Sequence, residues 1–237
     1  MVVGADVLGQ VLKTHASTLL HTSNVYHHEH AGKLAELLIT LTQKEGGLGF
    51  APGSSHALTD GSSGAKVFFS NSGTEANEGA LKIARKVGKA RWAAATGKAQ
   101  DDPACDKIEI VCFANAFHGR SMGALSVTTN PKYQKPFTPL IPGVKVGHLN
   151  DTVGLESLIG EKTCAVIVEP VQGEGGIHAA DASWLRALRK RCDEVGAVLI
   201  YDEIQVSQRR SFRRPQQADC LCRQLWRLHT YTHGRFD

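Results

Sequence analysis

The chain has 237 residues, 42% of them hydrophobic and 21% charged, with six cysteines and a formal net charge of +4. This ordinary globular composition excludes wholesale disorder and a collagen-like repeat, and no apolar run approaches the ~20 residues of a membrane span, so we expect no membrane partner. Six cysteines without paired spacing in the body of the chain do not indicate a disulfide framework, and they favour a reducing compartment.

Residues 1–45 are predicted to form a helical segment rather than a domain, because they are too few for an independent core. Apolar side chains recur at helical spacing from residue 7 to residue 20, and again from about residue 29 to residue 44. The sequence HHEH at residues 27–30 suggests a metal site. However, adjacent histidines point in different directions, and the outer pair has only i,i+3 spacing. We therefore expect local polarity at a helix start and no metal.

Residues 46–205 are predicted to form an α/β domain with a mostly parallel sheet and flanking helices. After a loop rich in glycine and serine, short apolar segments alternate with amphipathic ones. The predicted strands cover residues 66–70, 108–113, 144–146, 164–168 and 197–201, and the predicted helices cover residues 74–87, 152–159 and 183–194. Between the first helix and the second strand, residues 91–106 are polar and rich in alanine, and we expect an insertion there.

Residues 206–237 differ in composition from the rest of the chain. They hold seven arginines and no lysine against two aspartates, whereas the first 205 residues hold all fourteen lysines and carry a net charge of −1. This complete switch of basic residue predicts an atypical tail that is foreign to the preceding domain. Arginine-rich tails can bind nucleic acid, but the positive charge is confined to this tail, and we expect no nucleic-acid partner.

Four polar, glycine-containing motifs follow predicted strands, where ligands of parallel sheets bind. SNSGTEAN at residues 70–77 leads into a predicted helix whose N-terminal amides favour a phosphate. The alternative is a capped strand–helix turn. FHGR at residues 117–120 offers an aromatic ring for stacking and an arginine for a carboxylate. The alternative is a turn with one surface arginine.

The other two motifs carry carboxylates. EPVQGEGG at residues 169–176 places carboxylates beside flexible glycines. Such a segment either lines a mobile wall of a site or caps a loop. DEIQ at residues 202–205 ends the last predicted strand, where Asp202 pairs with a protonated heterocycle or caps the strand end. Each motif is weak alone, but the four in this order are jointly specific.

Together, the four motifs resemble those of the class III aminotransferases, which use pyridoxal 5′-phosphate, and within that family the acetylornithine aminotransferase group. The resemblance runs from about Thr14 to Gln205. It implies that residues 46–205 are part of the large domain of a fold-type I (aspartate-aminotransferase-like) transferase, with the small domain missing. The implied reaction is the transfer of an amino group from N-acetylornithine to 2-oxoglutarate in arginine biosynthesis.

The resemblance also assigns residues to the cofactor pyridoxal 5′-phosphate. By that resemblance, the first two bind the phosphate and the others surround the ring: Gly73, Thr74, Phe117, Asp202, Ile204 and Gln205. Phe117 stacks on the ring, and Asp202 keeps the ring nitrogen protonated, so that the ring withdraws electrons from the substrate. Ile204 packs on the other face of the ring, and Gln205 reaches the ring hydroxyl.

The substrates implied by the resemblance are a small amino acid and a 2-oxo acid. Arg120 holds a carboxylate of N-acetylornithine, and Glu174 and Tyr26 match substrate residues of the family more loosely. The family forms homodimers. An insertion like that of fungal members suggests the mitochondrial matrix, and a bacterial relative would be cytoplasmic. No arginine- and serine-rich transit peptide begins the chain.

Members of the family continue past DEIQ to a glycine-rich stretch and then to the lysine that forms the Schiff base with the cofactor. Here no lysine follows Gln205. The lysine is the general base of the reaction, so we expect no catalytic residue in this chain and no normal turnover by it alone. Two alternatives stay open: a fragment of an ornithine or other ω-amino-acid aminotransferase, and a non-catalytic regulatory fragment that pairs with a full-length subunit.

Overall fold

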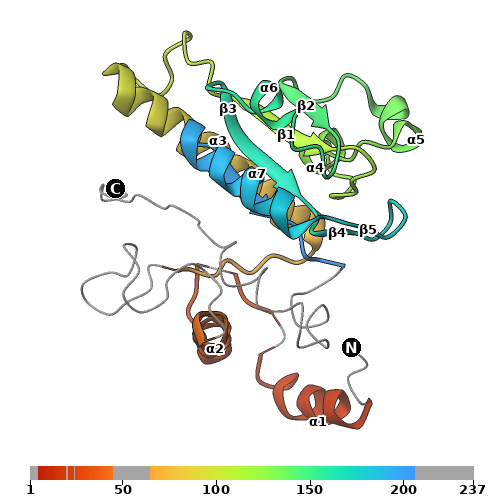
Figure 1. Cartoon of the computed structure of the whole chain (residues 1–237). Helices are drawn as coiled ribbons and strands as arrows, with labels where there is room; N and C mark the ends of the chain where they lie inside the picture. Colours follow the sequence, from red (N-terminus) through yellow and green to blue (C-terminus); the bar gives the residue numbers. More distant parts are fainter. Residues whose placement is uncertain (1–4, 20, 24, 45–64, 206–237) are drawn as a thin grey trace.

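The computed structural model of the chain describes residues 5–19, 21–23, 25–44 and 65–205, and its core is a four-stranded parallel sheet (Figure 1). The strands lie in the order β2-β1-β3-β6, with crossovers between neighbours. Their bounds are Glu109–Phe113 for β1, Val144–Gly147 for β2, Thr163–Val168 for β3 and Val198–Tyr201 for β6. The mostly parallel α/β sheet that the alternating pattern predicts is therefore confirmed.

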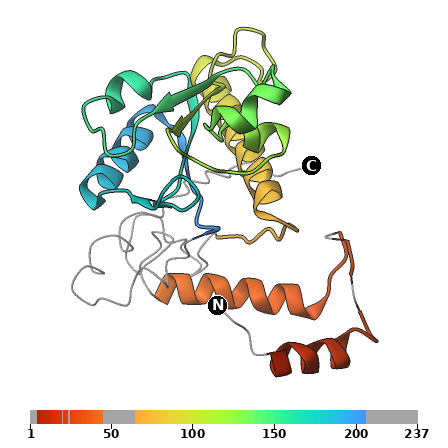
Figure 2. The same ribbon diagram turned by 90° about the vertical axis from the view of Figure 1, so that its right-hand side faces the viewer.

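Helices cover both faces of the sheet, as Figure 2 shows with α3 and α7 on opposite sides of it. Alternate strand residues supply the two cores: Val111 and Phe113 pack with α7, whereas Ile110 and Cys112 pack with α3. Every residue of β3 is buried, and all but Thr163 are apolar, as expected of a strand that helices cover on both faces. The helices are α3 (Gly73–Thr96) and α4 (Met122–Ser126) on one face and α6 (Leu155–Leu158) and α7 (Ala182–Val195) on the other.

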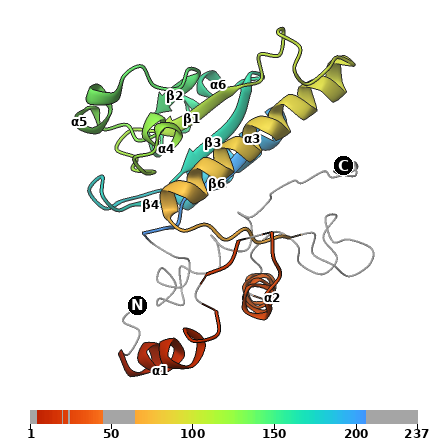
Figure 3. The same cartoon turned by 180° about the vertical axis from the view of Figure 1, so that it is seen from behind.

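Smaller elements complete the described part of the chain. They are the helices α1 (Ala5–His15), α2 (Glu29–Lys44), α5 (Pro131–Gln134) and η2 (Lys135–Phe137), and the antiparallel strands β4 (Val171–Gln172) and β5 (His178–Ala179). Figures 1 and 3 place α1 and α2 apart from the sheet, on the side toward which the strands point. No helix in the described ranges combines the length and apolar character needed to cross a membrane.

Three predicted elements need correction. Residues 66–70 are not a strand, because no strand of the described part of the chain pairs with them, and Phe68 stays 69% exposed. The helix predicted over residues 74–87 continues to Thr96, within the predicted insertion, and ends where Gly97 adopts a left-handed conformation with φ 71°. The helix predicted over residues 152–159 shortens to Leu155–Leu158, because Asp151 and Gly154 form a hydrogen-bonded turn before it.

The other predicted elements agree closely with the structure, apart from their ends. The helix predicted to residue 20 ends at His15 and the helix predicted from about residue 29 to residue 44 is observed as Glu29–Lys44. Gly196 ends α7 with φ 66°. Residues 46–64 and the tail of residues 206–237 lie outside the described residues, and the division of the chain into three parts stays a prediction.

Gly88 allows α3 to approach the sheet closely, and replacing it by alanine tests this packing. A Cβ atom at Gly88 would lie 2.5 Å from Cβ of Cys164 and 3.1 Å from the carbonyl oxygen of Lys107. We expect Gly88→Ala to lower the free energy of unfolding by about 1–3 kcal/mol. Gly79→Ala on the same helix meets no atom within 4 Å and should stabilise by up to about 1 kcal/mol. Urea denaturation measures both, and equal effects would contradict this account of the packing.

Candidate functional site

The carboxyl ends of the parallel strands bring together the motifs that were identified in the sequence. Asp202 follows β6, Glu169 follows β3 and the FHGR motif follows β1, while the N-terminus of α3 lies beside them. The hydroxyl of Ser72 caps this helix by accepting a hydrogen bond from the backbone N–H of Glu75. The shared direction of the strands therefore places segments that are more than a hundred residues apart in the sequence at one edge of the sheet.

The carboxylate of Asp202 is the centre of this edge and is only 7% exposed. Its Oδ2 accepts a hydrogen bond from Nδ2 of Asn77 at 2.8 Å and pairs with Nδ1 of His118 at 2.8 Å, while Oδ1 accepts from the backbone N–H of Ile204 at 3.1 Å. Burial disfavours the charged form, but the hydrogen bonds and the attraction of His118 outweigh it. The net effect lowers the pKa of Asp202 below its ordinary value of 3.8. The site therefore holds a buried carboxylate that is ionised at neutral pH.

Asn77 and His118 hold this carboxylate, and neither was assigned a role from the sequence. An ionised carboxylate only accepts hydrogen bonds, so Nδ1 of His118 carries the proton. Nδ2 of Asn77 also donates to the carbonyl oxygen of His118 at 2.7 Å. The other ring nitrogen of His118, Nε2, is buried without a partner in the described part of the chain. The only signal in the sequence was that Asn77 belongs to the SNSGTEAN motif and His118 to the FHGR motif.

Gly73 and Ile204 lie against each other next to Asp202. A Cβ atom at Gly73 would fall 2.6 Å from Cδ1 of Ile204, so a larger residue at position 73 would require the Ile204 side chain to shift. In the same way, a Cβ atom at Gly173 would lie 3.3 Å from that of Gln205. The structure thus brings the predicted cofactor residues Gly73, Ile204 and Gln205 to the edge where Asp202 lies.

Thr74 belongs to a hydrogen-bond network around the carboxylate of Glu78. Its hydroxyl lies 2.8 Å from Oγ of Ser121, which donates to Oε1 of Glu78 at 2.6 Å. The same oxygen accepts from the backbone N–H groups of Gly123 at 2.7 Å and Ala124 at 3.1 Å, at the start of α4. Burial opposes the charged form, but these hydrogen bonds prevail and lower the pKa of Glu78 below 4.5.

Glu78→Gln tests the electrostatic part of this network. Because the pKa of Glu78 is lower in the folded state, its charge stabilises the fold above pH 4.5. This stabilisation is lost as the pH falls through the pKa of the folded state. We expect the free energy of unfolding of the variant to be about 1 kcal/mol lower than that of the wild type at neutral pH. In strong acid the two values should be equal. Urea denaturation at both pH values measures this, with the exposed Glu156→Gln as control. A difference that is the same at both pH values would refute the electrostatic account.

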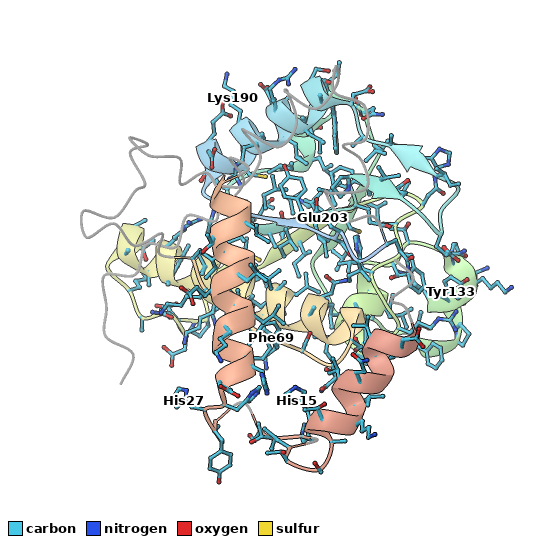
Figure 4. The ribbon with its side chains drawn as sticks, turned by 90° about the horizontal axis from the view of Figure 1, so that it is seen from below. His15, His27, Phe69, Tyr133, Lys190 and Glu203 are labelled. Carbon is cyan, nitrogen blue, oxygen red and sulfur yellow. The ribbon has the colours of Figure 1, made fainter. Side chains whose placement is uncertain are left out.

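Arg120, Glu174 and Phe117 meet around one further side chain, that of Tyr133 on α5. Its hydroxyl donates to Oε1 of Glu174 at 2.7 Å, and the guanidinium carbon of Arg120 lies 4.6 Å from the centroid of its ring. The rings of Phe117 and Tyr133 are in edge contact, with centroids 5.8 Å apart. Figure 4 shows Tyr133 on α5 at the periphery of the molecule seen from below. Nothing in the sequence indicated that Tyr133 joins these residues.

Glu169 fixes the backbone of Phe117 from the adjacent strand end. It is buried, and its Oε1 accepts the hydrogen bond of the Phe117 backbone N–H at 2.9 Å. Burial raises the pKa of this carboxyl group above 4.5, and the hydrogen bond from Phe117 partly offsets that effect. Glu169 therefore links β3 to the FHGR segment that contains the predicted stacking ring.

The remaining predicted site residue, Tyr26, lies in the turn before α2 and is 69% exposed. Its backbone N–H makes a local hydrogen bond to the carbonyl oxygen of Ser23 at 3.0 Å. In the HHEH segment, the ring of His30 contacts that of His15 with centroids 4.9 Å apart. Among the described residues, no group of three or more histidine, cysteine or acidic side chains is arranged to hold a metal ion.

The comparisons with known proteins agree on one family of enzymes. The family model "Aminotransferase class-III" matches residues 5–211. The mitochondrial acetylornithine aminotransferase of Neurospora crassa is 50% identical over 200 residues, which are 84% of this chain and 38% of that protein. The corresponding protein of Yarrowia lipolytica is 53% identical over 196 residues, which are 83% of this chain and 41% of that protein. The chain thus spans about two fifths of the length of the curated relatives that it matches.

Solved structures show the same likeness. The ornithine aminotransferase of Toxoplasma gondii ME49 has a TM-score of 0.66 at 26% identity, over 86% of this chain and 42% of that one. The N-acetylornithine aminotransferase of Stenotrophomonas maltophilia has a TM-score of 0.57 at 31% identity, over 86% of this chain and 42% of that one. Both matches cover less than half of the solved chains.

Proposed function

Because the chain belongs to the class III aminotransferases, we propose that it is the cofactor-binding part of an acetylornithine aminotransferase. The whole protein would transfer an amino group from N-acetylornithine to 2-oxoglutarate, a step of arginine biosynthesis. The observation that carries this proposal is the buried, ionised Asp202 held by Asn77 and His118 beside the N-terminus of α3. The two relatives at 50% and 53% identity, both named acetylornithine aminotransferases, support the choice of substrate.

We propose pyridoxal 5′-phosphate as the cofactor, and the residues at the edge of the sheet fit it. A buried carboxylate with a lowered pKa suits a protonated ring nitrogen, and the capped N-terminus of α3 offers backbone N–H groups to a phosphate. Gly73 and Thr74 would bind the phosphate, and Phe117 and Ile204 would lie on the faces of the ring. Gln205 would bind the ring hydroxyl. When bound, the cofactor supplies an electron-withdrawing ring for the substrate carbanion.

The residues of the chain would act on the reaction mainly by charge and orientation. Asp202 would hold the proton on the ring nitrogen, and Asn77 and His118 would keep the carboxylate ionised and fixed in direction. Arg120 would bind a substrate carboxylate through its guanidinium group. We also propose substrate contacts for Glu174 and Tyr26. We assign no catalytic residue within residues 5–205 and propose that turnover needs the further length that the relatives have.

Ornithine is the alternative amino donor. The ornithine aminotransferase of Toxoplasma gondii has a TM-score of 0.66, above the 0.57 of the Stenotrophomonas maltophilia N-acetylornithine enzyme, although its identity to the chain is lower. The fungal relatives are named mitochondrial, and we propose that location for the protein if it is fungal, with cytoplasm as the alternative. We propose a homodimer as its assembly.

Cofactor binding by the chain itself is the first test. Isothermal titration with pyridoxal phosphate and with pyridoxine phosphate is expected to show weak binding of similar affinity, because both share the phosphate and the ring but only the former can react with a lysine. Absence of binding by both compounds would refute the proposal. A large preference for the aldehyde that maps to one lysine would show instead that this chain supplies a Schiff-base residue.

Turnover is tested in a chimera. The 196-residue stretch of the Yarrowia lipolytica enzyme that matches the chain is replaced by the corresponding residues of the chain. We expect the chimera to form glutamate from N-acetylornithine and 2-oxoglutarate faster than from ornithine, and Arg120→Ala within it to raise KM. A folded chimera that binds cofactor but prefers ornithine would favour the alternative donor, and one without turnover on either donor would refute the proposed function.

A further inference from the structure

Tyr133 is held in a fixed position relative to the FHGR segment. It lies on the four-residue helix α5, which begins where Oδ1 of Asn130 accepts the backbone N–H of Lys132 at 3.0 Å. Thr129, the residue before Asn130, donates its backbone N–H to the carbonyl oxygen of Ala116 at 3.2 Å. The side chain of Gln134 donates to the carbonyl oxygen of Leu125 at 3.1 Å. The first hydrogen bond caps α5, and the other two fasten its ends to the segments on either side of Arg120.

From this position, the side chain of Tyr133 contacts two groups of opposite charge. The phenol hydroxyl donates to Oε1 of Glu174, on the loop between β4 and β5, while the guanidinium of Arg120 lies over the ring. The ring of Tyr133 gives the guanidinium a favourable cation–π contact. One side chain therefore satisfies the carboxylate with its hydroxyl and the cation with its ring.

Glu174 and Arg120 nevertheless do not pair with each other. No salt bridge within 4.0 Å joins Arg120 to an acidic group of the described residues, although both Arg120 and Glu174 contact the phenol of Tyr133. The hydrogen bond to Glu174 and the negative charge of that residue raise the pKa of Tyr133, and Arg120 opposes that effect. Both charges therefore act on the phenol, and without it they would be free to approach and neutralise each other.

We propose that Tyr133 is a positioning and specificity residue that keeps Arg120 and Glu174 apart, so that they bind opposite ends of one amino-acid substrate. Arg120 then takes the carboxylate, and Glu174 takes the positively charged or hydrogen-bond-donating end. The ligand class is a chain with a carboxylate at one end and an amine or amide N–H at the other. The inference rests on the proposed function for the ligand, and on the geometry of Tyr133 alone for the separation of the charges.

The contact between Tyr133 and Glu174, on which the separation depends, is tested in the ligand-free chain by the ultraviolet absorbance of tyrosinate. The phenol of Tyr133 is expected to titrate at lower pH in Glu174→Gln than in the wild type, because the carboxylate that disfavours the phenolate is neutralised. Tyr133→Phe should remove the transition that moves, which assigns it. Lys132→Ala, an exposed change on the same helix, should leave it in place. A titration that Glu174→Gln does not change would overturn the proposal.

The availability of Arg120 that Tyr133 preserves is tested by 2-oxoglutarate binding to the cofactor-loaded chain. This dicarboxylate lacks the amino end and therefore reports on the arginine alone. We expect Tyr133→Ala to weaken this affinity at least about tenfold, because Glu174 then pairs with Arg120. A factor of about ten corresponds to the loss of one charged hydrogen bond. The double variant Tyr133→Ala/Glu174→Gln should recover most of it, whereas simple damage to the fold would not be rescued. Unrescued loss overturns the proposal. If the wild type shows the shifted tyrosine titration but binds no 2-oxoglutarate, the proposed function and the assignment of Arg120 to a carboxylate fail, whereas the contact between Tyr133 and Glu174 stands.

Discussion

Replacing Asp202 by alanine is expected to weaken the binding of pyridoxal phosphate about 10- to 100-fold, because a charge-assisted hydrogen bond contributes about 1.5–3 kcal/mol. The carboxylate is buried and its pKa is held below 3.8, so at neutral pH it is charged and can pair with a protonated pyridine nitrogen. Asp202→Asn keeps the shape but removes the charge, and should bind nearly as weakly. Isothermal titration of the three chains measures the difference.

The same substitution also affects the ligand-free fold. Without Asp202, the Nδ1–H group of His118 loses its acceptor in a buried site, whereas Nδ2 of Asn77 keeps the carbonyl oxygen of His118. One buried donor left unsatisfied costs about 1–3 kcal/mol of unfolding free energy. The stability that the ionised Asp202 contributes should be present above pH 3.8 and be lost as the pH falls through the lower pKa of the folded state.

A matched control separates the site from acidic residues in general. Asp181 lies at the N-terminal end of α7 and is exposed, and its side chain makes no capping hydrogen bond. Asp181→Ala should therefore change neither cofactor affinity nor stability by more than the experimental error. If Asp202→Ala binds the cofactor as tightly as the wild type, Asp202 does not contact the ring nitrogen, and the proposed arrangement of the cofactor is wrong.

Trp184→Ala is expected to cause the largest loss of stability, about 3–5 kcal/mol, because it removes a fully buried aromatic side chain and leaves a cavity. Trp184 is 1% exposed, and its ring meets that of Phe113 edge to face with centroids 5.0 Å apart. Its Nε1–H also donates to the carbonyl oxygen of Asp151 at 3.1 Å. The substitution therefore removes the contact that joins α7 to both β1 and the turn before α6.

Denaturation by urea, followed by circular dichroism, measures this effect without relying on tryptophan fluorescence. Trp184→Phe retains most of the apolar volume and loses the indole N–H, so it should cost clearly less than the alanine variant. Val153, which is 93% exposed, supplies the surface control, and Val153→Ala should change stability by less than about 0.5 kcal/mol. Equal losses in Trp184→Ala and Val153→Ala would show that this core does not limit the stability of the chain.

The sequence alone was enough to predict the class of fold and the edge of the sheet at which the four motifs meet. The strand predicted over residues 164–168 is an apolar run bounded by polar residues, and it became the buried central strand β3. Parallel strands all end at one edge, so residues that follow them, such as Glu169 and Asp202, were expected to converge there. Local periodicity and strand direction were sufficient for both conclusions, because neither depends on which side chains finally touch.

Only the tertiary structure decided which side chains act together. Asn77 and Asp202 are 125 residues apart, and His118 and Asp202 are 84 apart, so no local pattern could pair them. Tyr133 lies 41 residues from Glu174 and belongs to none of the four motifs. Residues 66–70 have the composition of a strand, yet a strand forms only where a neighbouring chain segment supplies hydrogen-bond partners. Sequence patterns give the preference of each segment, but the direction of a side chain and its partners follow from how the segments pack.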